Sequence, residues 1–122
     1  MKVLLGIGGS DRCWEALSQT VARANEAGDD LTVAVYEDDA VGESTATIAD
    51  RVREEVDEAG LDADVRSVSG HPGGALVEIA DGEGFDRLVV AGGSRSTLGK
   101  IQLGGVAEFV VLNSETPVTL LR

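Results

Sequence analysis

The residues with the clearest potential for chemistry lie in one glycine-rich stretch, Gly92 to Gly105, which reads GGSRSTLGKIQLGG. Its glycines let the backbone turn freely, and its serine and threonine hydroxyls can donate hydrogen bonds. The chain has 22 acidic and 10 basic residues, yet no Asp or Glu occurs between Arg87 and Ala107. Arg95 and Lys100 lie inside this acid-free window. In so acidic a chain, a cationic glycine-rich loop indicates an anion site, most plausibly for phosphate.

The flanking segments place this stretch between a strand and a helix. Residues 87–91 are a short, apolar, β-branched run, which predicts a buried strand. After the loop, Val106, Phe109 and Val110 recur at helical spacing. The start of a helix carries partial positive charge and free N–H donors. Backbone groups as well as side chains would therefore face an anion held by this loop.

The rest of the chain alternates between strand and helix patterns. The expected strands are residues 2–7, 31–36, 64–69, 87–91 and 118–121, and the expected helices are about 11–27, 45–59, 75–82 and 106–113. This βαβαβαβαβ order requires a parallel sheet with helices on both faces and right-handed crossovers. We expect one α/β domain spanning residues 1–122. The pattern alone leaves the order of the strands in the sheet open.

Composition narrows the class of protein. The net charge of −12 disfavours direct binding to nucleic acid, which needs basic surfaces. The chain has no apolar run long enough to span a membrane, and its start lacks the architecture of a signal peptide. Its single cysteine, Cys13, excludes an internal disulfide and suits the cytoplasm. The spread of acids fits a halophile's cytoplasmic protein, and an ordinary acidic bacterial protein is the alternative.

Two common phosphate-binding fingerprints do not fit. Residues 6–11 begin like Gly-x-Gly-x-x-Gly, but Asp11 stands where the third glycine belongs. The pair Gly99-Lys100 is like the end of a Walker A loop. However, Ser94 replaces the first glycine of that motif, and Ile101 replaces its magnesium-binding Ser or Thr.

The loop resembles instead the nucleotide loop of the universal stress protein family. ATP-binding members of that family carry Gly-x2-Gly-x9-Gly-[Ser/Thr] between the fourth strand and the fourth helix. Gly93 can supply the first glycine and Gly104 the third. Residues 3–10 and 104–121 are similar to the family's first strand and loop and to its closing helix and strand. The resemblance covers essentially the whole chain, and it implies a Rossmann-like, open five-stranded parallel sheet of order 3-2-1-4-5.

The chain departs from the family's pattern at three positions. Ser96 takes the place of the second glycine (Arg95, if Gly92 is the anchor), and Gly105 takes the Ser/Thr slot. Gly8 stands where ATP-binding members usually have an Asp near the adenine. The loop is also two residues shorter than the pattern when counted from Gly93. Three outcomes stay open: an adenine nucleotide, another phosphate or anion, and no physiological ligand.

For an adenine nucleotide, the resemblance implies ATP, ADP or AMP across the carboxyl edge of the first and fourth strands, with or without Mg²⁺. The base would lie near Ile7, Gly8, Gly9 and Val35. The phosphates would contact Gly92, Gly93, Ser94, Arg95, Ser96, Thr97, Lys100, Gly104, Gly105 and Val106. No base or water-positioning residue is evident, so we expect no enzyme beyond slow ATP hydrolysis, and no protein metal site.

Four further features have plainer interpretations. The acids of residues 37–39 follow the second strand, where they could bind ribose or a divalent metal, but a solvated acidic loop is the favoured interpretation. His71 is expected in a loop, and no partner in sequence suggests catalysis. Cys13 is expected to be a small packing residue and Trp14 to lie in the core or at its rim.

The last predicted strand is an apolar sheet edge with only Pro117 to guard it, and such an edge invites pairing. The resemblance implies a homodimer across this strand, through Val118, Thr119, Leu120 and Leu121. We therefore expect a small dimeric stress-response regulator with a nucleotide site. The alternative is a dimeric member of the same family that binds no nucleotide and acts through an unidentified protein partner. Neither involves nucleic acid or a membrane.

Overall fold

The computed structural model describes residues 1–92, 94–95, 101–102 and 104–121, and it is built around one parallel sheet. The strands of that sheet are β1 (Lys2–Ile7), β2 (Asp30–Val35), β3 (Asp64–Ser67), β4 (Arg87–Ala91) and β7 (Val118–Leu121). The helices are α1 (Asp11–Ala27), α2 (Thr45–Glu58), α3 (Pro72–Gly82) and α4 (Gly105–Asn113). The spatial order β3-β2-β1-β4-β7 confirms the order that the family resemblance implied.

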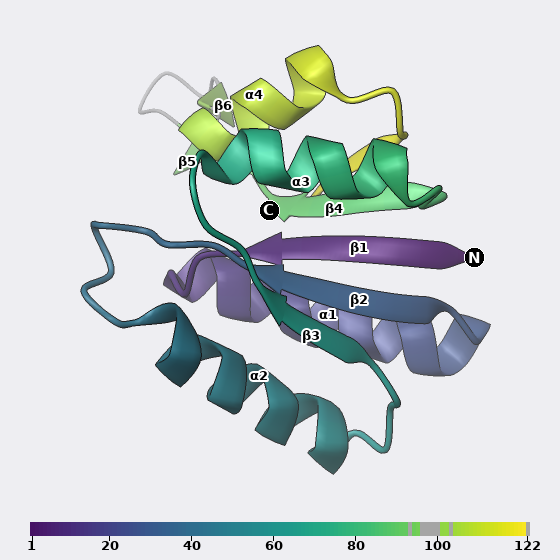
Figure 1. The fold of residues 1–122 in the computed structure, drawn as a ribbon. Coiled ribbons are helices and arrows are strands. Elements are labelled where there is room, and N and C mark those ends of the chain that lie inside the picture. Colours follow the sequence, from purple (N-terminus) through teal and green to yellow (C-terminus); the bar gives the residue numbers. More distant parts are fainter. Residues whose placement is uncertain (93, 96–100, 103, 122) are drawn as a thin grey trace.

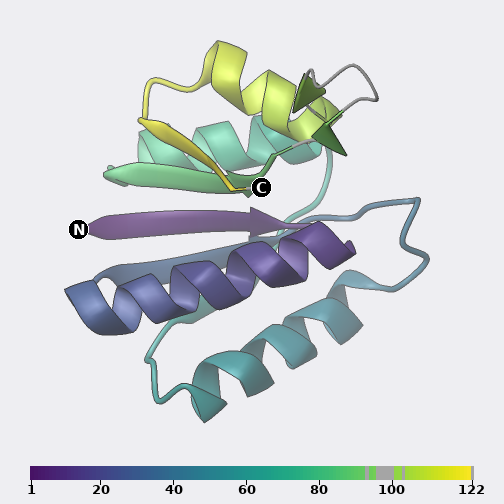
Figure 2. The ribbon, with the colours of Figure 1, turned by 180° about the vertical axis from the view of Figure 1, so that it is seen from behind.

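The sheet is the middle layer of three (Figures 1 and 2). Helices α1 and α2 cover one face, over β1, β2, β3 and β4, and helices α3 and α4 cover the other face. Side chains alternate between the two faces along each strand. In β1, Val3, Leu5 and Ile7 therefore pack in the core under α1, while Leu4 packs in the core under α3.

The helices begin and end where local chemistry dictates. Ser10 caps α1, its hydroxyl oxygen accepting from the Cys13 backbone N–H at 3.4 Å. Gly28, at φ +72°, ends α1 in the left-handed region that favours glycine. Ser44 caps α2 in the same way by accepting from the Thr47 N–H. These caps fix the two helices that support the first half of the sheet.

The structure corrects three predicted segments. Helix α3 begins at Pro72 rather than about Ala75, because His71 caps it: its Nδ1 accepts from the Gly74 N–H at 2.9 Å. Strand β3 ends at Ser67 rather than residue 69. The predicted loop before α4 contains two short antiparallel strands, β5 (Ser94–Arg95) and β6 (Ile101–Gln102).

In the described part of the chain, no helix is both long enough and apolar enough to cross a membrane.

Candidate functional site

A cleft of about 750 Å³ opens at the carboxyl edge of the sheet. Strand β1 continues into α1 on one face, while the chain after β4 leads to α4 on the other face (Figure 1). Ligands of doubly wound sheets bind at such a switch point. The cleft is lined by Ser10, Arg12, Cys13, Tyr36, Glu37, Asp38, Asp39, Ala40, Pro72, Ala91, Gly92, Gly104, Gly105, Val106 and Ala107.

One wall of the cleft is the first turn of α4. Gly104 is the N-cap, with extended backbone at φ −66° and ψ 163°, and no side chain of the described residues caps the helix. The first N–H groups of α4 are thus left for another acceptor. A Cβ atom added at Gly104 or Gly105 would meet no atom within 4 Å. Packing of the described residues therefore does not require glycine at either position, whereas close approach of a ligand to the backbone would.

The opposite wall is formed by the ends of β1 and β2. A Cβ atom at Gly8 would lie 2.5 Å from Cε1 of Tyr36 and 3.1 Å from Cβ of Asp38. The Tyr36 ring therefore occupies the space that a side chain at position 8 would need. The Gly8 N–H donates to Cys13 Sγ at 3.3 Å, and the Tyr36 hydroxyl lies 4.0 Å from the same sulfur.

The Tyr36 phenol stays protonated. Burial raises its pKa most, and the neighbouring Cys13 and Asp38 raise it further. A neutral phenol ring offers a flat apolar face and one hydroxyl rather than a charge. This end of the cleft is thus suited to a flat, uncharged group.

Trp14 ties the loop after β1 to α2. Its indole Nε1 donates to the Gly9 carbonyl at 3.0 Å, and the Arg51 guanidinium lies 3.9 Å from the centre of its ring. Gly9 has φ +88°, and a Cβ atom there would lie 2.6 Å from Cδ1 of Ile48. Trp14 is half-buried, which agrees with its predicted place at the rim of the core. The loop after β1, which reaches the cleft at Ser10, is therefore tied to α1 and α2 by these contacts.

The structure brings some of the predicted nucleotide contacts together at the cleft. The glycines Gly92, Gly104 and Gly105 line it together with Val106, and Gly8 contacts two residues that line it. Ile7 and Val35 are correctly placed at the strand ends, but their side chains are 0% exposed and belong to the core under α1. Ser94 and Arg95 form β5. The remaining predicted contacts, Gly93, Ser96, Thr97 and Lys100, lie outside the described residues.

Sequence reasoning missed Arg12, Tyr36 and Pro72 as residues of the cleft. Strand register is the signal that could have found Tyr36. Ile7 pairs with Val35, so the next residue, Tyr36, lies level with Gly8 and points to the face opposite Val35. Pro72 could not have been placed, because it reaches the cleft only through the early start of α3.

The acids of residues 37–39 line the cleft near its Tyr36 end. Asp38 is half-buried and its Oδ1 accepts from the Ala40 N–H at 3.0 Å, which shapes the turn. Within the described residues, no group of three or more His, Cys, Asp or Glu side chains could hold a metal ion. The segment thus brings negative charge into the lining of the cleft.

The chain matches known proteins over its whole length. The model of the universal stress protein family matches residues 1–122. A universal stress protein from Archaeoglobus fulgidus has a TM-score of 0.82 at 20% identity, and the match covers 100% of this chain and 98% of that one. None of the curated protein sequences gives a significant match.

Two further solved structures carry nucleotides. A universal stress protein in complex with cAMP has a TM-score of 0.78 at 29% identity, with 99% of this chain and 95% of that chain covered. A family protein from Arabidopsis thaliana with AMP bound has a TM-score of 0.74 at 18% identity, covering 99% and 90% of the two chains.

Proposed function

Because the chain belongs to the universal stress protein family, we propose that it is a small regulatory protein that binds an adenine nucleotide in the cleft at the carboxyl edge of β1 and β4. The start of α4 carries the proposal: Gly104 and Gly105 line the cleft, leave the helix uncapped and are not needed for packing. Phosphate suits such a site, because free N–H donors and the helix dipole both favour an anion. A similar protein that has been solved with cAMP supports the choice of nucleotide.

We place the phosphates at the start of α4 and the base at the Tyr36 end. The half-buried Tyr36 ring offers the base a flat face in place of the carboxylate that the family motif would put at Gly8. The acids of residues 37–39 also line the cleft, and there a carboxylate can accept hydrogen bonds from ribose hydroxyls. They also repel extra phosphate charge, so AMP should bind at least as well as ATP unless Mg²⁺ accompanies the triphosphate.

We propose binding and release of the nucleotide rather than turnover. Among the described residues, those of Gly92 and the start of α4 that line the cleft have no carboxylate or imidazole that could activate water beside a phosphate, and Glu108 in the first turn of α4 is not part of the lining. Tyr36 remains protonated and cannot act as a base.

A thermal shift experiment with AMP, ATP and ATP with Mg²⁺ tests the proposal. A ligand at a hundred times its Kd stabilises by roughly 2.7 kcal/mol, or about 10 °C for a domain near this size. Gly104→Val should keep the fold, because a Cβ atom added there meets no described atom within 4 Å, and should remove most of the shift. Gly82→Val is the matched control, because Gly82 is equally open and lies at the end of α3.

Wild-type protein that is folded but shows no shift with any nucleotide would overturn the proposal. The dimeric interaction protein without a nucleotide would then be the better account. An equal shift in the wild type and Gly104→Val would place the nucleotide elsewhere.

We also propose that two copies pair through the outer edge of β7. Val118, Thr119, Leu120 and Leu121 are each half-buried, and in the described part of the chain β7 pairs only with β4. The carbonyls of Pro117 and Leu121 accept from β4 and from the residue that follows it. Since alternate residues direct their backbone groups to opposite edges, Val118 and Leu120 face outward. Free edges of this kind favour strand pairing.

Analytical ultracentrifugation of two variants at one position tests the pairing. Val118→Pro removes the outward N–H, whereas Val118→Ala shortens the side chain and keeps that N–H. The proline variant should be monomeric where the alanine variant is dimeric. A dimer of equal strength in both variants would contradict pairing through this edge.

A further inference from the structure

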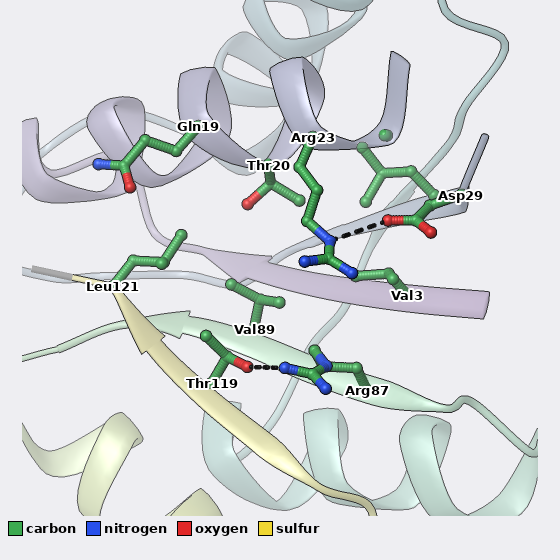
Figure 3. A pocket seen from close by; sticks show the side chains of 11 residues that line it. Val3, Gln19, Thr20, Arg23, Asp29, Arg87, Val89, Thr119 and Leu121 are labelled. Atoms are coloured by element: carbon green, nitrogen blue, oxygen red, sulfur yellow. Dashed lines mark hydrogen bonds and ion pairs between the residues drawn. The ribbon is translucent and has the colours of Figure 1, made fainter. Parts of the chain in front are cut away.

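A second cavity, of about 250 Å³, lies on the α1 face of the sheet (Figure 3). Its walls come mainly from the first halves of β1, β2 and β4, from β7 and from the second half of α1. It is therefore separate from the cleft, which lies beyond the carboxyl ends of the strands. It stays open because α1 and α2 lie over β1, β2, β3 and β4, and no described helix covers β7 on this face (Figure 2).

The floor of the cavity is apolar. Val3, Leu31 and Val89 are buried, and Leu121 packs against the same core from the edge strand. The side chains of these residues share the α1 face because of the strand register, in which Val3 pairs with Leu31 and Val89 with Thr119. A ligand here would rest an aliphatic or aromatic portion on this floor.

Arg87 is an exception to the apolar side chains on this face, because it is charged. It pairs in register with Val3, so strand alternation gives a charged side chain a position otherwise taken by apolar ones. Its Nη1 donates to the Thr119 hydroxyl at 2.8 Å (Figure 3). Its Nε is buried and has no hydrogen-bond partner among the residues that the structure describes. None of the ion pairs among the described residues includes Arg87, although the chain carries 22 acids.

The one carboxylate that lines the cavity is already engaged elsewhere. Asp29 is 5% exposed, and its Oδ2 accepts from Nε of Arg23 at 3.2 Å (Figure 3). The cavity thus contains two guanidinium groups, those of Arg23 and Arg87, and one carboxylate. A half-buried arginine without an anionic partner is costly in isolation, and an anion supplied from outside would offset that cost.

We propose that this cavity binds a small organic monocarboxylate. The carboxylate would accept hydrogen bonds from Arg87, whose planar guanidinium matches carboxylate geometry. A short aliphatic chain would lie on Val3, Val89 and Leu121. One guanidinium without an ion pair among the described residues, over an apolar floor, favours a singly charged acid with a hydrocarbon tail over a multiply charged phosphate. The proposal does not depend on a nucleotide in the cleft.

A titration followed by amide NMR tests the site, with butyrate, hexanoate and uncharged hexanol as probes. Hexanoate should give saturable shifts at Val3, Val89 and Thr119 and should bind more tightly than hexanol. Arg87→Gln should weaken the binding of hexanoate by about tenfold or more, which is the loss expected for a charge-assisted hydrogen bond. The affinity of Arg87→Lys for hexanoate should lie between the affinities of the wild type and Arg87→Gln. Arg53→Gln is the control, since Arg53 is exposed on α2 and pairs only with Asp50.

Three results would overturn the proposal. The first is an absence of saturable shifts with hexanoate at millimolar concentrations. The second is equal affinity for hexanoate in the wild type and Arg87→Gln, or equal affinity for hexanol and hexanoate. The third is that Arg87→Gln weakens the dimer in ultracentrifugation without affecting hexanoate, because a carboxylate of a second copy would then be the partner of Arg87.

Discussion

Gly8 and Tyr36 compete for one space where β1 and β2 end. Tyr36 Cε1 lies 2.5 Å from where a Cβ atom of residue 8 would be. The family motif calls for an Asp at position 8, and here the ring of a residue from the next strand fills that place. A side chain at position 8 and the Tyr36 ring therefore need the same space.

The shared space predicts that substitutions at positions 8 and 36 have strongly coupled effects on stability. Gly8→Asp alone should destabilise the protein by about 1–3 kcal/mol, because the new side chain overpacks against Tyr36. Tyr36→Val makes room, so the double variant should lose much less than the sum of the single variants. Denaturant unfolding of all four proteins measures the coupling. Costs that add within about 0.5 kcal/mol would show that the positions act independently.

Asp81 connects the end of α3 to the segment before β7. Its carboxylate accepts from the Thr116 hydroxyl at 2.7 Å, from the Thr116 N–H at 3.0 Å and from the Glu115 N–H at 3.2 Å. The Thr116 hydroxyl contributes most to lowering the pKa of Asp81. Sequence reasoning did not single out this carboxylate, because its partners lie far along the chain.

A lowered pKa in the folded state makes stability depend on pH. The contribution of ionised Asp81 is present above its unfolded pKa of about 3.9 and is lost as the pH falls through the folded value. Asp81→Asn should therefore lower the melting temperature at neutral pH and should flatten the loss of stability in acid. Glu78→Gln, an exposed change on the same helix, should do neither. Parallel acid profiles for the wild type and Asp81→Asn would contradict this role.

At the scale of elements, helix α3 supports α4 and so positions the start of α4 at the cleft. Gly73 makes the contact possible: a Cβ atom there would lie 2.7 Å from Cδ1 of Phe109. The Phe109 ring also packs against His71, with ring centres 4.6 Å apart. The capped start of α3 therefore packs closely against the first half of α4.

Two alanine substitutions in α3 should have opposite effects. Gly73→Ala should destabilise by about 1–3 kcal/mol through overpacking against Phe109. Gly82→Ala meets no atom within 4 Å and should stabilise by up to about 1 kcal/mol, since alanine favours helix. Denaturant midpoints of the two variants measure the contrast. Equal effects would mean that helix propensity, and not the contact with α4, controls this position.

Periodicity predicted the strands and helices of the main sheet, but it could not predict their arrangement. The apolar run at residues 87–91 is a buried strand, and the α1 stripe of Leu17, Val21 and Ala24 is buried as expected. Strand order came from the family resemblance, because apolar patterns carry no information about neighbours. The early start of α3 was missed because the capping group is a histidine ring, which is a rare N-cap.

The candidate site was predictable to the extent that it depends on local sequence. The acid-free glycine-rich loop predicted a site that includes Gly104 and Gly105, and both residues line the cleft. Its opposite wall depends on the register between β1 and β2, and the cavity beside Arg87 depends on which strands the helices leave uncovered. Neither feature is local in sequence, so a single chain without its fold could not reveal them.

For the whole molecule, the net charge of −12 should make stability depend on salt. Self-repulsion of the acidic surface is screened as the Debye length falls from about 10 Å at 0.1 M to about 3 Å at 1 M salt. The melting temperature should therefore rise between these KCl concentrations. A variant with several exposed acids of α2, such as Glu54 and Glu58, changed to Gln should show a smaller rise. A flat or falling melting temperature in the wild type would show that surface repulsion does not limit stability.

The most direct test of the account is to map AMP onto the folded protein by amide chemical shifts in molar KCl. We expect the largest changes at Ser10, Gly92, Gly105 and Val106, with further changes beside Tyr36. The amide chemical shifts of the cavity residues Val3 and Thr119 should not change. Saturable shifts confined to the cleft would support a nucleotide held at the start of α4. Saturation without shifts at Gly105 and Val106, or no saturation at all, would contradict it.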